Sequence, residues 1–354
     1  MDHVVVLAGG SGTRFWPESR ARRSKQFLDL TGNGPMIKET LNRLPPRLRK
    51  ENIWVVAGEK DAPHLSARTL GIPARNILLE PEGKNTAPAV GLAVAHIARR
   101  DLGAVIAAAP ADHAIADVRA FRAALSKALG VARRTGRFVV LGITPAHPAT
   151  GYGYIERGKP FPGGGSGVFG VRRFTEKPDL ATARRFHKTG RFSWNSGIFL
   201  FRAETFADRL SRFLPEVHEG IEGAFRSFGK KDFAGKLRAA YRRLPSISVD
   251  YGILEKEKDL LLLPAEFGWS DLGTWRSLHE FLAKPGGNVT FGDVILSDCR
   301  NALVRTDRGL VAVAGMEDVV VIRNGEAVLV CPRTRSEEVK RIAEEVRRRF
   351  PHLA

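Results

Sequence analysis

Short apolar runs that alternate with helical patterns constrain the fold of this chain more than any other feature. The runs lie at residues 3–8, 53–57, 104–109 and 138–141, and the helical patterns at 35–44, 87–100 and 121–134. Apolar strands alternating with helices predict a parallel sheet that is covered on both faces. Because ligands of such sheets bind beyond the carboxyl ends of the strands, the residues that follow each run are candidates for a site.

The pattern changes after residue 150. Strand patterns at 152–156 and 168–175 flank a glycine-rich tip, and helix patterns at 180–188, 203–213 and 230–242 accompany a strand pattern at 197–201. We therefore predict an α/β fold with a Rossmann-like, mixed but mainly parallel sheet, in a first domain over residues 1–284.

A small second domain is expected over residues 285–354. The Pro-Gly-Gly-Asn stretch at 285–288 indicates a linker. Short β-branched runs follow at 294–296, 302–305, 310–313, 319–322 and 327–330. An amphipathic helix is predicted from Ser336 to about Phe350, after this all-β unit. The pattern fits a short solenoid and a small sheet equally well.

Charge and cysteine content narrow the partners and the compartment. The net charge of +18 attracts anions, but the basic residues are scattered and no nucleic-acid-binding module is present, so we expect no nucleic-acid partner. Cys299 and Cys331 lack metal-ligand partners at zinc spacing and are expected to be free thiols, as in a reducing compartment. No apolar stretch is long enough for a membrane span, and the first apolar run lacks the basic residues that precede a signal sequence. We expect a cytoplasmic protein without a membrane partner.

A glycine-rich loop follows the first apolar run. In Leu7-Ala8-Gly9-Gly10-Ser11-Gly12-Thr13-Arg14 the glycines allow backbone N–H groups to point at phosphate oxygens. Arg14 and Lys25 add fixed positive charge. The run is not a Walker loop, which needs G-x-x-x-x-G-K-[ST], and it is not a Rossmann fingerprint, because Phe15 stands where the third glycine is required. A tight strand-to-helix turn is the structural alternative.

The run from Leu7 to Pro17, followed by Lys25-Gln26-Phe27, resembles the sugar-nucleotide pyrophosphorylases. Within them it most resembles the mannose-1-phosphate guanylyltransferases, a likeness that extends over residues 1 to about 280. The resemblance implies a nucleotidyltransferase domain. It implies that Arg14 and Lys25 are catalytic and stabilise charge at the α-phosphate. It also implies that the loop binds the nucleotide through Leu7, Ala8, Gly9, Gly10, Gly12 and Thr13.

Two aspartates are candidate metal ligands. Asp112 follows the apolar run at 104–109 after Pro110 and Ala111, and Asp271 lies in Gly268-Trp269-Ser270-Asp271. Two carboxylates with waters and phosphate oxygens suit Mg²⁺, whereas helix capping is the structural alternative for each aspartate. The resemblance implies that Asp112 is a catalytic metal ligand, and that Asp271 is a second ligand that also faces the sugar phosphate.

The remaining candidates are assigned to the base and the sugar. The resemblance places the segment 80–89 near the base, where a carboxylate such as Glu80 can accept from two guanine N–H groups; Asn85 or Thr86 also fits a helix N-cap. The nucleotide-binding candidates here are Glu80, Lys84, Asn85 and Thr86. The sugar-phosphate-binding candidates are Tyr152, Gly153, Glu176, Lys177 and Asn195, each of which has turn or surface chemistry as its alternative.

The reaction implied by the resemblance joins GTP to α-D-mannose 1-phosphate and releases GDP-mannose and pyrophosphate, with Mg²⁺ assisting an in-line attack on the α-phosphate. A different pair of nucleotide and hexose 1-phosphate is one alternative. A non-catalytic regulator that binds GDP-mannose is another. The C-terminal β unit and its helix offer a possible homodimer interface.

Overall fold

The computed structural model describes residues 1–10, 12–20 and 23–353, so Ser11 of the glycine-rich loop lies outside the described residues. The chain forms two compact units, each described by itself. The sheet unit contains Met1–Gly9, Arg43–Ala111 and Ile115–Trp269. The β-coil unit contains Gly10–Asn42, Asp112–Ala114 and Ser270–Ala354. The division of the chain at residue 284 stays a prediction.

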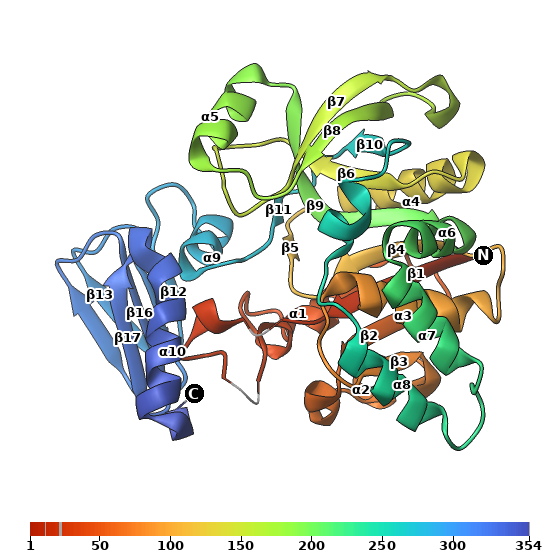
Figure 1. Ribbon diagram of the computed structural model, residues 1–354. Coiled ribbons are helices and arrows are strands. Elements are labelled where there is room, and N and C mark those ends of the chain that lie inside the picture. The colour runs from red at the N-terminus through yellow and green to blue at the C-terminus, as the bar shows by residue number, and fades with distance from the viewer. Residues whose placement is uncertain (11, 21–22, 354) are drawn as a thin grey trace. The chain divides into compact units, whose positions relative to one another are not determined.

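Nine strands form one mixed sheet in the described part of the sheet unit (Figure 1). β1 pairs in parallel with β2 and β4, β2 pairs in parallel with β3, and β9 runs antiparallel between β4 and β6. The predicted α/β class is therefore confirmed. In sheet order the strands are β3 (Ile77–Glu80), β2 (Ile53–Gly58), β1 (Asp2–Ala8), β4 (Val105–Pro110), β9 (Phe192–Arg202), β6 (Val139–Ile143), β10 (Leu261–Pro264), β8 (Phe169–Thr175) and β7 (Tyr154–Pro160).

Both faces of the central strands are covered. Val4, Val5 and Val6 of β1 are all at most 1% exposed, and consecutive strand residues face opposite sides of a sheet. One hydrophobic cluster joins residues of β1, β4 and β9 to residues of four helices and of the π-helical turn Asp250–Leu254. These helices are α3 (Thr86–Ala98), α6 (Ala203–Phe213), α7 (Pro215–Phe225) and α8 (Phe233–Arg243).

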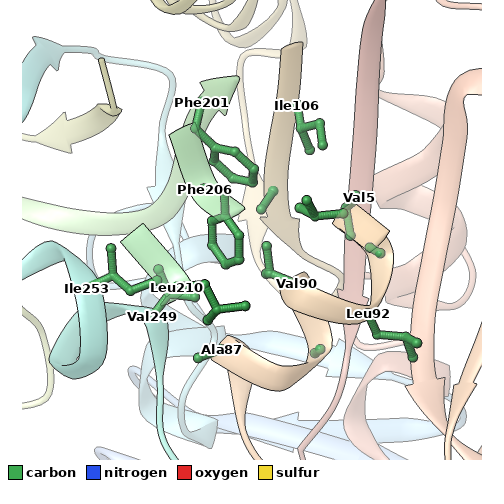
Figure 2. Packing of buried hydrophobic residues seen from close by; sticks show 14 of the residues in the cluster. Val5, Ala87, Val90, Leu92, Ile106, Phe201, Phe206, Leu210, Val249 and Ile253 are labelled. Carbon is green, nitrogen blue, oxygen red and sulfur yellow. The ribbon is translucent and has the colours of Figure 1, made fainter. Parts of the chain in front are cut away.

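Phe201 of β9 and Phe206 of α6 are both members of this cluster. Figure 2 shows the rings of Phe201 and Phe206 beside Val90 of α3, and the ring centroids are 4.8 Å apart. α4 (Val118–Thr135) packs on β4, β6 and β9 and contributes no residue to this cluster. The short helices α2 (Ala67–Leu70) and α5 (Leu180–Thr189) complete the helices of this unit among the described residues.

The C-terminal strands form a solenoid, which settles the alternative that the sequence left open. β12 (Val289–Phe291), β14 (Leu303–Thr306) and β16 (Val319–Asn324) stack in parallel, and β13 (Val294–Ser297) stacks in parallel with β15 (Val311–Ala314). β17 (Ala327–Pro332) closes the stack in antiparallel pairing with β16. Among the described residues of the β-coil unit, the α-helices are α1 (Met36–Asn42), α9 (Trp275–Leu282) and α10 (Val339–Arg349), and η8 (Arg333–Glu338) is a 3₁₀ turn.

The segment that carries the glycine-rich loop shares the hydrophobic core of this solenoid. Phe15, Trp16 and Leu28 are buried in one cluster with Leu303 and Val320 of the coils. Val339 and Ala343 of α10 belong to the same cluster. The loop of the β-coil unit is therefore built on the C-terminal strands and helix.

Two local predictions differ from the structure. The helix predicted over 203–213 has the bounds of α6, but α7, which Pro215 opens directly after Leu214, was not predicted. The last helix begins at Val339, not Ser336, because residues 333–338 form the 3₁₀ turn η8.

The expectation of free thiols fits the structure. In residues 1–10, 12–20 and 23–353, no helix combines the length and the apolar character that a membrane span needs. Cys299 and Cys331 are free thiols, and both are half-buried.

The core of the sheet unit yields a stability prediction. Phe201→Ala removes a fully buried ring and is expected to lower the free energy of unfolding by about 3–5 kcal/mol. Leu102→Ala is the control, because Leu102 is 81% exposed, and is expected to change it by less than about 0.5 kcal/mol. Urea unfolding followed by tryptophan fluorescence measures both; equal midpoints for the two variants would contradict the core assignment.

Candidate active site

A cavity of about 330 Å³ in the β-coil unit brings the predicted phosphate and metal residues together. Its lining includes Arg14 and Lys25 from the loop segment, Asp112, and Asp271 from the stretch before α9. The other lining residues are Gly12, Thr13, Phe15, His113, Gly273 and Lys340. Residues that are far apart in the sequence thus surround one polar cavity.

Lys25 is held at this cavity by two acceptors. Its buried Nζ donates to Asp112 Oδ2 at 2.9 Å and to the Asp271 carbonyl at 2.6 Å. Gly12 has φ of 59°, and a Cβ there would lie 2.5 Å from Lys25 Cβ. Only glycine fits both the conformation and the close approach, so the loop runs directly over the Lys25 side chain.

Helix capping accounts for neither aspartate of the cavity. α4 is capped by Asp117, and α9 is capped by Thr274 in a capping box with Ser277. Asp271 Oδ1 instead accepts from the Gly273 N–H at 3.0 Å. Burial opposes the ionisation of Asp112, but the charges of Lys25 and His113 outweigh burial and lower the pKa of its carboxyl. Asp112 therefore presents a carboxylate to the cavity at neutral pH.

Side chains of the coils and helices fix the segment that follows the loop. Trp275 Nε1 donates to the Trp16 carbonyl, and Trp16 Nε1 donates to the Leu353 carbonyl, both at 3.1 Å. Arg305 of β14 pairs with the buried Glu18 at 3.0 Å. Sequence reasoning missed Arg305, because nothing in a β-branched run marks an arginine that points at a distant carboxylate.

The first residues of the glycine-rich loop belong to the sheet unit. Leu7 and Ala8 end β1, and Leu7 lies in register with Pro110 of β4. The Ala111 N–H donates to the Leu7 carbonyl at 2.9 Å. The chain therefore leaves the sheet at two neighbouring strand ends. β1 leads into Gly9 and Gly10, and β4 leads into Asp112.

The segment predicted to bind the base is hydrogen-bonded to the residues before the π-helical turn. Asn85 is the N-cap of α3, and its Oδ1 accepts from the Thr86 N–H at 2.8 Å. Thr86 Oγ1 accepts from the Val249 N–H at 2.9 Å, and the Lys84 carbonyl accepts from the Ile247 N–H at 3.1 Å. The structure thus brings Lys84, Asn85 and Thr86 together at the start of α3.

Glu80 ends β3 and is buried. Its Oε1 has no hydrogen-bond partner among the described residues. Burial raises the pKa of the Glu80 carboxyl to about 8, and a hydrogen bond with Tyr241 opposes this only in part. The carboxyl is therefore mainly protonated at neutral pH in the protein alone.

The predicted sugar residues form a second cluster in the sheet unit. Glu176 is paired with Lys177 at 3.1 Å, and a Cβ on Gly153 would lie 2.4 Å from Glu176 Oε2. This oxygen is buried and has no partner in the part of the chain that the structure describes. The Tyr152 ring packs edge-on against Trp194, next to Asn195. The five predicted sugar-phosphate residues of this unit are thus neighbours, and Gly153 makes room for the Glu176 carboxyl.

Asp250 belongs to this cluster and was missed from the sequence. Asn195 Nδ2 donates to Asp250 Oδ1 at 2.6 Å, while Asn195 Oδ1 accepts from the Gly197 N–H at 3.1 Å. The Asn195 amide is thus fixed in orientation. Burial raises the pKa of Asp250, and burial followed by the charge of Asp250 raises that of Glu176. Asp250 begins the π-helical turn Asp250–Leu254, and such turns are frequent at functional sites. The turn is visible only in the structure, so nothing in the sequence marked Asp250.

The burial of Glu80 predicts a pH-dependent stability. With a folded pKa near 8 and an ordinary value of 4.5, the folded protein keeps a proton that the unfolded chain releases. The free energy of unfolding should therefore fall as pH rises from about 4.5 to about 8, by up to about 1.4 kcal/mol per pH unit. Glu80→Gln removes this fall, so its stability relative to the wild type should increase with pH across the window.

Urea unfolding at pH 5, 6, 7 and 8 measures the effect. Glu82→Gln is the matched control, because the Glu82 side chain is exposed, and it should follow the wild type. A Glu80→Gln variant that runs parallel to the wild type at all four pH values would show that Glu80 ionises normally.

Comparison with known proteins supplies the family. The nucleotidyl transferase family model matches residues 3–285, and a MannoseP isomerase/GMP-like beta-helix domain model matches residues 292–346. The xanthan biosynthesis protein XanB of Xanthomonas campestris pv. campestris (strain B100) is 40% identical, over 97% of this chain and 73% of that protein. The mannose-1-phosphate guanylyltransferase ManC of Salmonella typhimurium is 40% identical, over 98% of this chain and 73% of that protein.

A solved structure agrees with these relatives. The crystal structure of mannose-1-phosphate geranyltransferase from Thermus thermophilus superposes with a TM-score of 0.88 at 34% identity, covering 98% of this chain and 99% of that one. The beta-helix match fits the stacked coils seen here, and the transferase match spans the sheet and the residues around Lys25. With a family model matched over most of its length and relatives 40% identical along nearly all of it, this chain belongs to the nucleotidyl transferase family.

Proposed function

We propose that the protein is a mannose-1-phosphate guanylyltransferase, which converts GTP and α-D-mannose 1-phosphate into GDP-mannose and pyrophosphate. The observation that carries the proposal is the cavity in which Lys25 lies against Asp112 and the Asp271 carbonyl, with Arg14 beside it. The substrate pair is supported by the guanylyltransferase from Salmonella typhimurium, which is 40% identical.

The cavity residues fit a magnesium ion. Mg²⁺ prefers oxygen ligands, and proteins bind it through one or two carboxylates that substrate phosphates and water complete. Asp112 and Asp271 line one cavity, and no group of three or more metal-binding side chains is gathered among the described residues. A site with two carboxylates and room for phosphate oxygens matches that preference. When bound, the ion would neutralise phosphate charge and align the two substrates.

Catalysis in this proposal is positioning and charge stabilisation. A phosphate oxygen of mannose 1-phosphate attacks the α-phosphorus of GTP in line, and the bond to the β-phosphate oxygen breaks as pyrophosphate leaves. The attacking oxygen is already anionic, so no general base is required. Lys25 and Arg14 donate to the phosphate oxygens and stabilise the charge that develops. Asp112 holds the Lys25 ammonium in place, and Gly10, Gly12 and Thr13 offer backbone N–H groups.

The base and the sugar are assigned to the sheet unit. One carboxyl oxygen of Glu80 accepts no hydrogen bond from the described residues. Guanine offers two neighbouring N–H donors, which would favour the ionised form of the Glu80 carboxyl. The nucleotide is also assigned to two backbone segments. One is the start of α3, with Lys84, Asn85 and Thr86, and the other is the end of β1, with Leu7, Ala8 and Gly9. Glu176 Oε2, likewise unfilled, accepts from sugar hydroxyls, and the sugar phosphate is assigned to Lys177 and to Asp271. Asn195, Tyr152 and Gly153 shape the sugar pocket.

The surroundings of the protein are also part of the proposal. The two free cysteines support a cytoplasmic location. The exposed Val328 and Val330 of β17 and Ile342 of α10 support a homodimer formed through the β-coil unit.

The function is tested by pyrophosphate release. Four nucleoside triphosphates are combined with mannose, glucose and galactose 1-phosphates, with and without Mg²⁺. Release only from GTP with mannose 1-phosphate and Mg²⁺ is expected. Release from another pair would overturn the assignment of the base and sugar pockets, and no release from any pair would overturn the enzymatic function.

Asp112→Ala is expected to fold and to lose at least about 10³-fold in kcat, because it removes a metal ligand and the acceptor that holds Lys25. Asp259→Ala, a change at an exposed ion pair of the sheet unit, should keep wild-type turnover. Circular dichroism confirms folding, and the pyrophosphate assay measures kcat. Turnover by Asp112→Ala within about tenfold of the wild type would remove Asp112 from the site.

A further inference from the structure

Lys340 of α10 lines the same cavity as Lys25, Asp112 and Asp271. The residue lies in the last helix of the chain, and the function proposed above gives it no role. Its ammonium lies 3.9 Å from Glu344 Oε1, and both side chains are more than half exposed. Such a surface ion pair contributes little, so the ammonium can turn to a ligand in the cavity at small cost.

The backbone that carries Lys340 is held firmly against the loop segment. Val339 and Ala343, on the same helix, are buried in one hydrophobic cluster with Phe15 and Trp16. Phe15 directly follows Arg14 in the chain. The helix and the loop segment therefore form one packed body, which fixes the start of the Lys340 side chain relative to the cavity.

The Arg14 guanidinium forms an ion pair with a carboxylate that lies just before α10. Arg14 Nε donates to Glu337 Oε2 at 2.9 Å, and both side chains are largely exposed. Glu337 lies in η8, directly before α10. A phosphate oxygen that approaches the Nε side of Arg14 competes with the Glu337 carboxylate, because a guanidinium uses the same donors for carboxylates and phosphates.

We propose that Lys340 binds the terminal phosphates of the nucleotide, and so the pyrophosphate that leaves, while Glu337 occupies Arg14 until those phosphates displace it. The inference deepens the proposed function and rests on it for the identity of the polyphosphate. Negative charge grows on the pyrophosphate as its bond to the α-phosphorus breaks, so cations beside it are worth more at that stage. Lys25 is held by Asp112 and the Asp271 carbonyl, and Arg14 by Glu337. Lys340 adds a further cation to Lys25 and Arg14 in the lining of the same cavity.

Binding of pyrophosphate to the full-length protein tests the role of Lys340. Isothermal titration with magnesium pyrophosphate compares the wild type with Lys340→Ala, Lys340→Arg and Arg341→Ala. Lys340→Ala should bind about tenfold more weakly or worse, because a charge-assisted contact is lost. Lys340→Arg should stay within about threefold of the wild type, since the charge is kept. Arg341→Ala, one position along the same helix but outside the cavity lining, should match the wild type.

A kinetic split separates phosphate binding from a purely structural role. In the reverse reaction Lys340→Ala should raise the KM for pyrophosphate about tenfold or more and leave the KM for GDP-mannose within about twofold. Unchanged pyrophosphate affinity, or an equal loss for both substrates, would overturn the assignment of Lys340.

Glu337→Gln tests the competition for Arg14. The variant should bind pyrophosphate several-fold more tightly, because the amide is a weaker partner for Arg14 than the carboxylate. Equal or weaker binding would overturn the competition. The titration needs no turnover, so a protein that binds pyrophosphate through Lys340 but releases none from any substrate pair would refute the proposed function alone.

Discussion

The contact of the Lys25 ammonium with the Asp112 carboxylate and the Asp271 carbonyl is the interaction on which the candidate site depends. It joins three segments of the β-coil unit: the loop segment, the short stretch at residues 112–114 and the stretch before α9. Removing one partner of an ion pair leaves the other charge uncompensated, and the 27% exposure of the Asp112 side chain lets water screen part of that cost here. The same contact aims a cation and a carboxylate into one cavity, so stability and chemistry rely on the same atoms.

The C-terminal coils support the residues of this site. The loop segment that follows Gly12 is anchored by Trp275, by Arg305 and by the carbonyl near the end of the chain that accepts from Trp16. These anchors come from α9, from a coil strand and from the residues after α10. A solenoid has a rigid, repetitive core, because each coil packs on its neighbours. It therefore gives a glycine-rich loop the fixed support that the loop's own sequence lacks.

The sequence predicted the sheet and its helices because fully apolar strands and amphipathic helices leave distinct periodic patterns. It also marked two strand ends as candidates for a site, since Gly9 and Asp112 come after apolar runs. The pairing of Lys25 with Asp112 could not be predicted from spacing, because only the fold brings these residues together. Asp250 and Arg305 were missed for the same reason, since their partners Asn195 and Glu18 are distant in the sequence. Lys340 was missed because only the fold brings α10 to the cavity. The bounds of α6 were predicted correctly, but α7, which begins after a single residue, was missed.

The sequence predicted helix-capping residues at the starts of α3 and α9. It could not decide whether Asn85 and Asp271 cap a helix or bind a ligand. The structure separates these alternatives at α9, where Thr274 caps the helix, so that capping does not explain Asp271. At α3 both hold, because Asn85 is the N-cap of a helix that starts beside the predicted base segment. Glu80 shows the opposite case, in which a residue selected for its hydrogen-bonding capacity proves to be buried with a raised pKa.

The central claim is that the cavity around Lys25 holds the phosphates of a nucleotide. A crystal structure of the full-length protein with Mg²⁺ and a GTP analogue that cannot be cleaved at the α-phosphate tests it most directly. The account predicts the triphosphate in this cavity, with Lys25 at the α-phosphate and the metal ion on the carboxylates of Asp112 and Asp271. A triphosphate bound elsewhere, or in the cavity without contact to Lys25 and both aspartates, would contradict the account.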